Sequence, residues 1–210
     1  MKCIWQSVRC NKRNQFVGAH KFLHSTVFGE TQVRYTGKSA GKFTGKKKGN
    51  AVDAAVTKAV NGQKVSGPVG RLATTILKTL KRDYNMRPTT TQLQITHKRL
   101  KVSPICDLVG TTSSGTPIIV EIKCGKTAGS TTLSGQQRNL CGVLSDIKDT
   151  WRNRAFAQLA LQHHAAQETS RDVGLDGVFK RLVSLLLCVD PSGKIKVMKL
   201  PKKFLSAFNA

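Results

Sequence analysis

The sequence predicts an α/β domain, and three observations support this class. Apolar residues recur at helical spacing in two successive stretches, residues 50–62 and 68–84. Two apolar, β-branched runs joined by turn residues follow over 105–127, and a second such pair closes the chain over 181–200. Because the chain has 210 residues and 39% apolar content, it is long enough for one core and short for two.

The composition points to a polyanionic partner. Lys and Arg number 35 against 11 acids, a formal net charge of +24, so nucleic acid is the first expectation and an anionic membrane surface the second. No apolar run is long enough to span a membrane, and the first thirty residues lack a secretory signal. We expect an intracellular protein without a membrane partner, whether nuclear, mitochondrial or at a site of viral replication. Its oligomeric state stays open.

The first 48 residues differ from the rest in charge. They contain eleven Lys or Arg residues and Glu30 as the only acid, so we expect a basic N-terminal arm over 1–48 and the domain over 49–210. The arm is interpreted as a solvated extension, a segment that contacts phosphates, or an organelle transit sequence. Candidate nucleic-acid contacts at its end are Lys46, Lys47 and Lys48.

Two further motifs in the arm do not meet their requirements. A zinc site would use Cys3, Cys10, His20 and His24. Six residues separate the two cysteines where two to four are usual, which argues against zinc. The glycine-rich segment 37–49 lacks the spacing of a phosphate-binding loop, so an ATPase is not expected. The six cysteines of the chain form no C-x-x-C pair and are expected to be reduced thiols.

The two predicted helices carry charged residues with two possible roles each. Asp53 flanks the apolar face of the first helix, where it is either an ordinary first-turn carboxylate or a metal ligand. Pro68 opens the second helix. Cations crowd the end of that helix, where the helix dipole favours them and where they are able to contact phosphate. They are Lys78, Lys81, Arg82 and Arg87.

The runs over 105–127 form a predicted hairpin that carries two acids and an amine. Side chains two apart share one face of a strand, so Glu121 and Lys123 point the same way and Asp107 lies across from them. Buried charges are costly unless they are paired or bind metal. Oxygen ligands from Asp107, Glu121 and the Ile122 carbonyl suit Mg²⁺, with Mn²⁺ able to substitute. The alternative is an exposed, salt-bridged hairpin in a basic protein.

Asp107 followed fourteen positions later by Glu121-Ile122-Lys123 resembles the core of the PD-(D/E)XK nuclease superfamily, although Cys106 stands where Pro is usual. The resemblance implies a restriction-endonuclease-like core, a mixed central sheet flanked by helices. It implies that Asp107 and Glu121 hold the metal and that Lys123 positions the attacking water. Asp53 resembles the early-helix residue that completes the metal site in many relatives.

The segment DTWRNRAFAQLAL, residues 149–161, is similar to the helix that follows E-x-K in the lambda-exonuclease and RecB-like branch. In that branch a Gln contacts the site, which implies this role for Gln158; the alternative is a core amide bonded to backbone. Trp151, Arg152 and Arg154 are expected either to contact the nucleic acid next to the site or to cap the start of this helix, and Lys126 is a further candidate contact.

Together these features predict a Mg²⁺-dependent deoxyribonuclease that acts in DNA repair, recombination or replication. The resemblance favours an exonuclease that processes duplex or single-stranded DNA ends. Two alternatives remain: a non-catalytic basic protein that binds nucleic acid through its charge, and a nuclease of the same fold that cuts RNA or branched DNA internally.

Overall fold

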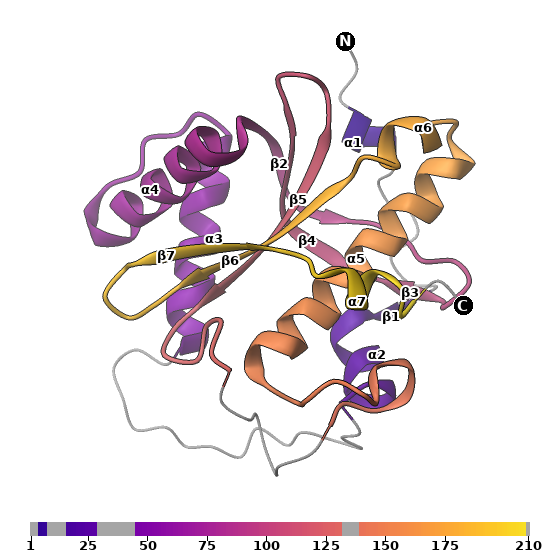
Figure 1. Cartoon of the computed structure of the whole chain (residues 1–210). Helices are drawn as coiled ribbons and strands as arrows, with labels where there is room; N and C mark the ends of the chain where they lie inside the picture. The colour runs from indigo at the N-terminus through magenta and orange to yellow at the C-terminus, as the bar shows by residue number, and fades with distance from the viewer. Residues whose placement is uncertain (1–3, 8–15, 29–44, 132–138, 209–210) are drawn as a thin grey trace.

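The computed structural model describes residues 4–7, 16–28, 45–131 and 139–208. Its centre is a five-stranded mixed sheet in the order β2-β4-β5-β6-β7 (Figure 1). Only the β5–β6 pair is parallel within this sheet; its other neighbours are antiparallel. The strands are β2 (Met86–Gln94), β4 (Ile105–Thr112), β5 (Pro117–Cys124), β6 (Val183–Val189) and β7 (Ile195–Lys199).

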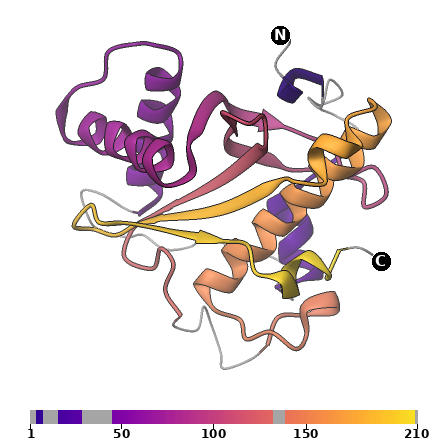
Figure 2. The same ribbon diagram turned by 45° about the horizontal axis from the view of Figure 1, so that its top comes forward.

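Helices cover both faces of the sheet (Figure 2). The longer helices are α2 (Ala19–Thr26), α3 (Gly45–Val60), α4 (Gly67–Tyr84) and α5 (Trp151–Asp172). The short elements are α1 (Ile4–Ser7), η1 (Gly142–Leu144), α6 (Asp176–Phe179), α7 (Lys202–Leu205) and a parallel pair of two-residue strands, β1 (Val17–Gly18) and β3 (Val102–Ser103). Within the described ranges, no helix is long and apolar enough to cross a membrane. The predicted α/β class, a mixed central sheet flanked by helices, is confirmed.

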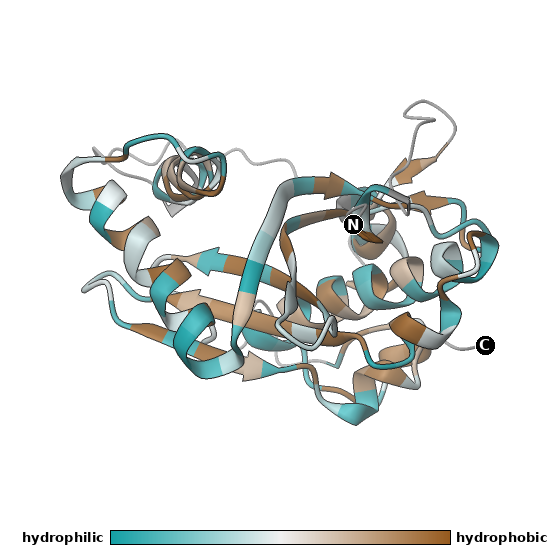
Figure 3. Cartoon of the chain, turned by 90° about the horizontal axis from the view of Figure 1, so that it is seen from above, coloured by the Kyte–Doolittle hydropathy of each residue, from teal (hydrophilic) through white to brown (hydrophobic). Residues whose placement is uncertain are grey.

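Alternation along the strands divides the core between the two faces. Ile119 and Leu186 face the cluster that includes α5 and α2, whereas Val120 and Leu185 face the cluster that includes α3 and α4. The central strands carry hydrophobic residues (Figure 3), because a strand covered on both faces needs an apolar side chain at almost every position. A charged residue on β5 is therefore an exception to be explained.

The connection from α4 to β2 is set by local backbone chemistry. Pro68 lies in the first turn of α4, where its missing N–H is not needed. Asn85 caps the C-terminus of the helix, and its left-handed φ of 49° allows the chain to reverse directly into β2. Strand β2 therefore begins at Met86, before Pro88, and ends at Gln94.

The N-terminal segment contributes to the core, in contrast to the expected arm over 1–48. The side chain of Trp5 is fully buried, and its Nε1 donates a hydrogen bond to the carbonyl oxygen of Gly110 at 2.8 Å. Its ring packs edge-on against Phe179, and Leu23 of α2 is also buried in this cluster. Residues 4–7 and 16–28 are thus part of the folded domain, while 29–44 lie outside the described residues.

Candidate active site

The hairpin of β4 and β5 is fully paired near its turn and opens at Asp107. Register partners run from Thr111↔Pro117 to Leu108↔Val120 and stop there, although both strands continue. Asp107 fills the gap with its side chain, and its Oδ2 accepts a hydrogen bond from the Ile122 backbone N–H at 2.8 Å. A carboxylate thus replaces a strand carbonyl as the acceptor, which places a charge inside the sheet.

Glu121 is the most deeply buried of the charged residues on β5, with 1% of its surface exposed. Its Oε1 accepts a hydrogen bond from Lys123 Nζ at 2.5 Å. Its Oε2 accepts one from Gln162 Nε2 at 2.6 Å, and that amide also donates to the Ile105 carbonyl. Both carboxylate oxygens are therefore held in place, as a buried charge requires.

Lys123 connects the carboxylates to α5. Its Nζ donates a second hydrogen bond to Gln158 Oε1 at 3.0 Å, and 35% of its side chain is exposed. Burial lowers the pKa of the ammonium, but the charges of Glu121 and Asp107 outweigh this effect, and the pKa lies above its ordinary value. Lys123 is thus a charged donor that reaches solvent, and not a neutral base.

Asp53 on α3 completes a cluster of three carboxylates around one ammonium. Burial and the charge of Glu121 raise the pKa of Asp53 to about 6, although Lys123 opposes this. Burial and the same Glu121 charge hold the pKa of Asp107 well above its usual range, against the opposing effects of Lys123 and the Ile122 N–H. If all three carboxyl groups were ionised, the cluster would carry more negative charge than its single ammonium neutralises, and the raised pKa values of Asp53 and Asp107 reflect this cost.

The donor set fits a hard divalent cation in its chemistry. Mg²⁺ is usually held by one or two carboxylates, with water and substrate phosphate in the other positions. Asp107 Oδ1 has only a 3.4 Å contact with Gln92, and Asp53 makes no hydrogen bond to another described residue. Within a strand, the N–H and C=O of one residue point to the same side, so the Ile122 carbonyl faces the Asp107 side. Glu121, by contrast, is already engaged by two donors.

The side chains alone do not form a complete metal cage. Among the described ranges, no group of three or more His, Cys, Asp and Glu residues is close enough to hold an ion by itself. Of the residues considered for zinc, Cys3, Cys10 and the His20 side chain lie outside the described residues, and His24 packs edge-on against Phe28. Magnesium at the hairpin therefore stays a proposal that depends on backbone, water and phosphate oxygens.

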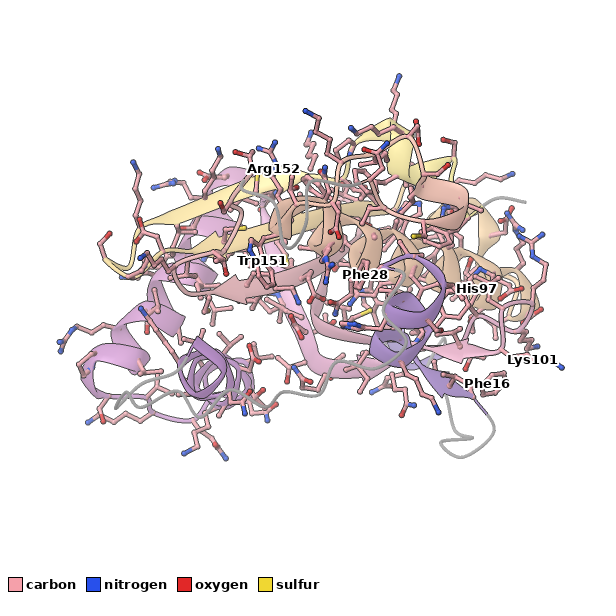
Figure 4. All side chains as sticks on the ribbon, turned by 90° about the horizontal axis from the view of Figure 1, so that it is seen from below. Phe16, Phe28, His97, Lys101, Trp151 and Arg152 are labelled. Atoms are coloured by element: carbon pink, nitrogen blue, oxygen red, sulfur yellow. The ribbon has the colours of Figure 1, made fainter. Side chains whose placement is uncertain are left out.

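The residues expected to contact nucleic acid divide into two groups. Trp151 is 41% exposed at the start of α5, next to Arg152 (Figure 4), and Lys126 is exposed just after β5. Arg154 has a structural role instead. Its Nε and Nη2 donate to Asp149 at 2.6 and 2.7 Å, and its guanidinium lies 4.6 Å from the Phe28 ring centroid. An Arg held in this way stabilises the helix start and is not placed to contact a ligand.

The lysines at the start of α3 are described only in part. Lys48 Nζ donates to the Pro191 carbonyl in the β6–β7 turn at 3.3 Å, which brings this end of α3 to the open end of β5. The side chains of Lys46 and Lys47 lie outside the described residues.

Comparisons with known proteins identify no family. No protein-family model matches the chain, and no curated protein matches it in sequence. Among solved structures, a protein described as a putative exonuclease from Eubacterium rectale has 12% identity and a TM-score of 0.47, over 91% of this chain and 74% of that one. The structure of SSO0001 has 11% identity and a TM-score of 0.31, over 97% and 78%. Both are too distant to assign a family or an activity.

Two residues at this site were not expected from the sequence. Gln162 holds Glu121, and its own Oε1 has no hydrogen-bond partner among the described residues. Its position four residues after Gln158 was the available signal, since residues i and i+4 share one face of a helix. Gln92 is exposed beside Asp107 with a left-handed φ of 50°, a conformation that no pattern in the sequence indicates.

Proposed function

We propose that the chain is a Mg²⁺-dependent deoxyribonuclease and that Asp107, Glu121, Lys123 and Gln158 form its catalytic site. The observation that supports this most is the opened hairpin. It combines a carboxylate inserted between two strands with an amine that both touches the second carboxylate and reaches solvent. An ordinary surface salt bridge would not require the sheet to open.

Each residue has a role that follows from its contacts. Gln158 and Glu121 hold Lys123 Nζ from two directions, so the ammonium is fixed at the point where it can donate to a phosphate oxygen or an attacking water. Asp107, Asp53 and the Ile122 carbonyl would supply the oxygen atoms that hold the metal. When bound, Mg²⁺ or Mn²⁺ would neutralise charge on the scissile phosphate and lower the pKa of bound water.

The net charge of +24 supports DNA as the substrate, since affinity for a polyanion rises with the number of phosphates neutralised. This term is independent of sequence and is weakened by salt. Exonuclease action on DNA ends is the finer part of the proposal. An exonuclease needs an end, whereas an endonuclease of the same chemistry does not.

The test is a cleavage assay on linear and circular duplex DNA, with and without Mg²⁺. We expect the wild type to degrade linear DNA only when metal is present, and Lys123→Ala to lose about a thousandfold in rate or more. Lys202→Ala on α7 removes an exposed lysine and should retain full activity. Binding by both variants should stay close to wild type, because phosphate contacts are shared among many cations.

Three outcomes would change the proposal. Equal cleavage by Lys123→Ala and the wild type would remove the site assignment. If circular DNA is cut as fast as linear DNA, the activity is that of an endonuclease and not of an exonuclease. DNA binding without cleavage under any metal condition would leave a non-catalytic binding protein.

A further inference from the structure

A pocket of about 920 Å³ lies away from the hairpin site, between the end of α3, the second half of α4 and the first residues of β2. These three segments lie together on one side of the molecule (Figure 1). Its size is in the range of pockets that bind small organic ligands. None of the residues assigned above to the hairpin site lines it.

The charged residues that line this pocket all have the same sign. Its lining contains three cations and no acid: Lys78, Lys81 and Arg87. All three are exposed, and none forms an ion pair with a described acid, whereas neighbouring Arg82 is paired with Asp83. The sequence alone placed these four cations together; the structure separates Arg82 from the three that line the pocket.

The positions of the three cations follow from the backbone. Lys78 and Lys81 are three residues apart and therefore share one face of α4. The left-handed turn at Asn85 brings the chain back beside the same helix. On β2, Met86 then points into the core while Arg87 points out. The cations thus converge from two elements and do not form a single charged stripe on one helix.

The remaining lining is largely apolar and includes Val60, Val65, Leu77 and Met86. A ligand that fits must combine an anionic group with a flat or apolar part. A nucleotide has this combination: its phosphate matches the cations and its base can pack on aliphatic surface.

The path of β2 links the pocket to the hairpin site. Arg87 pairs in register with Thr111, and Gln92, five residues further along the strand, contacts Asp107. Five residues of a regular strand span about 17 Å, and the irregularity between Pro88 and Thr90 shortens this span. The distance is therefore at most about five nucleotide steps of a B-form strand at ~3.4 Å each. A strand cleaved at the hairpin could therefore reach the pocket with a nucleotide up to about five positions from the cleaved bond.

We propose that the pocket lined by Lys78, Lys81 and Arg87 binds one nucleotide of the DNA strand that enters the hairpin site. This inference rests on the proposed function, because it assigns the pocket to the same substrate. It makes the pocket a second anchor that fixes where along the strand the hairpin acts.

The experiment compares two triple variants with the same change in charge. The first is Lys78→Gln, Lys81→Gln and Arg87→Gln. The control neutralises three exposed cations elsewhere in the chain, two in turns and one on α7: Lys101→Gln, Arg181→Gln and Lys202→Gln. Lys101 lies on the side away from α3 and α4 (Figure 4). Binding of a labelled oligothymidylate of about twelve nucleotides is measured by anisotropy in chelator, so that cleavage does not interfere.

We expect the pocket triple to weaken binding about tenfold or more. The slope of the logarithm of the association constant against the logarithm of the salt concentration should become less steep by about two. The control triple should change affinity by less than about threefold. Equal losses in both triples would show that only total charge matters and would overturn the pocket. Thermal unfolding checks that both triples are folded, as expected for exposed side chains.

A third variant, Thr74→Trp, fills the pocket from an exposed position of α4 without changing the charge. It should weaken binding about fivefold or more; wild-type binding would show that nothing enters the pocket. Thymidine monophosphate should displace the oligonucleotide from the wild type better than inorganic phosphate does. Equal competition would mean that the site recognises charge alone, which overturns the nucleotide assignment.

The two proposals fail separately. If the pocket triple and Thr74→Trp both weaken DNA binding, but neither the wild type nor any variant cleaves DNA, the pocket proposal is supported and the nuclease proposal is wrong. If cleavage depends on Lys123 and on metal, while the pocket triple and the control triple bind DNA with equal affinity, the nuclease proposal is supported and the pocket proposal is wrong.

Discussion

Two buried ionic clusters in this protein are built on opposite principles. At the start of α5, one guanidinium and one carboxylate, Arg154 and Asp149, make two parallel hydrogen bonds with side chains that are 12% and 0% exposed. At the hairpin, three carboxylates surround the single ammonium of Lys123, and two of them have raised pKa values. The first cluster is balanced within the protein. The second has three carboxyl groups for one ammonium, so it is balanced only when protons or a further cation join it.

The difference separates structural from functional charge. A bidentate Arg–carboxylate pair satisfies its donors and acceptors in a fixed geometry. Unbalanced, partly exposed charge destabilises the fold and is typical of sites that bind or react. Arg154 was expected from the sequence to bind nucleic acid, yet it belongs to the balanced cluster.

The largest expected effect concerns the balanced cluster. Asp149→Ala leaves the guanidinium of Arg154 buried without its carboxylate, so we expect the free energy of unfolding to fall by about 3–5 kcal/mol. In a chain of this size that lowers Tm by about 10 °C, as measured by calorimetry. The double variant with Arg154→Met should recover part of the loss. A double variant as unstable as the sum of both single variants would show that the pair is not coupled.

A third buried group of titratable residues tests the same distinction by pH. Burial lowers the pKa of His163 and of His164 to about 4, and His163 Nδ1 lies 2.9 Å from Ser184 Oγ. The folded state thus binds these protons only near pH 4, while the unfolded state binds them near the ordinary value of 6.5. Their contribution to stability is full above about pH 6.5 and falls as the pH is lowered.

At pH 5 each histidine should reduce the free energy of unfolding by about 2 kcal/mol, relative to pH 7. Urea unfolding at both values measures this. His164→Leu removes one of the two groups and should lose about half of the pH dependence. An unchanged dependence in that variant would show that other groups cause the acid destabilisation.

The sequence predicted the hairpin site because its signals are local. Alternation on β5 is sufficient to place Glu121 and Lys123 on one face. The resemblance of residues 149–161 to the helix that follows E-x-K implied that Gln158 lies beside them. The burial of Trp5 was not visible, because its partners Gly110 and Phe179 are more than a hundred residues away in the chain.

Other features depend on backbone geometry that residue types do not specify. The hairpin opens because Asp107 substitutes for a strand carbonyl, and Gln92 adopts a left-handed φ that is uncommon for its residue type. Arg154 shows a different reason. A basic residue at a helix start is equally compatible with an exposed contact and with a buried partner, and only the position of Asp149 five residues earlier decides between them.

The smallest expected effect is a gain in stability and not a loss. It distinguishes the hairpin cluster from the balanced pair of Arg154 and Asp149 most directly. In Asp107→Asn the amide oxygen can still accept the Ile122 N–H, but a carboxyl whose pKa is held well above its usual range by burial and by the charge of Glu121 is replaced by a neutral group. The free energy of unfolding should therefore rise by about 1 kcal/mol at pH 7 in chelator, a Tm gain of about 2–4 °C. Asp83→Asn, which changes an exposed carboxylate paired with Arg82, should stay within about 0.5 kcal/mol of the wild type. Mg²⁺ should raise the Tm of the wild type and shift Asp107→Asn less, because the variant has lost one anionic ligand. A less stable Asn variant with an undiminished response to Mg²⁺ would place Asp107 with Asp149 among the structural charges.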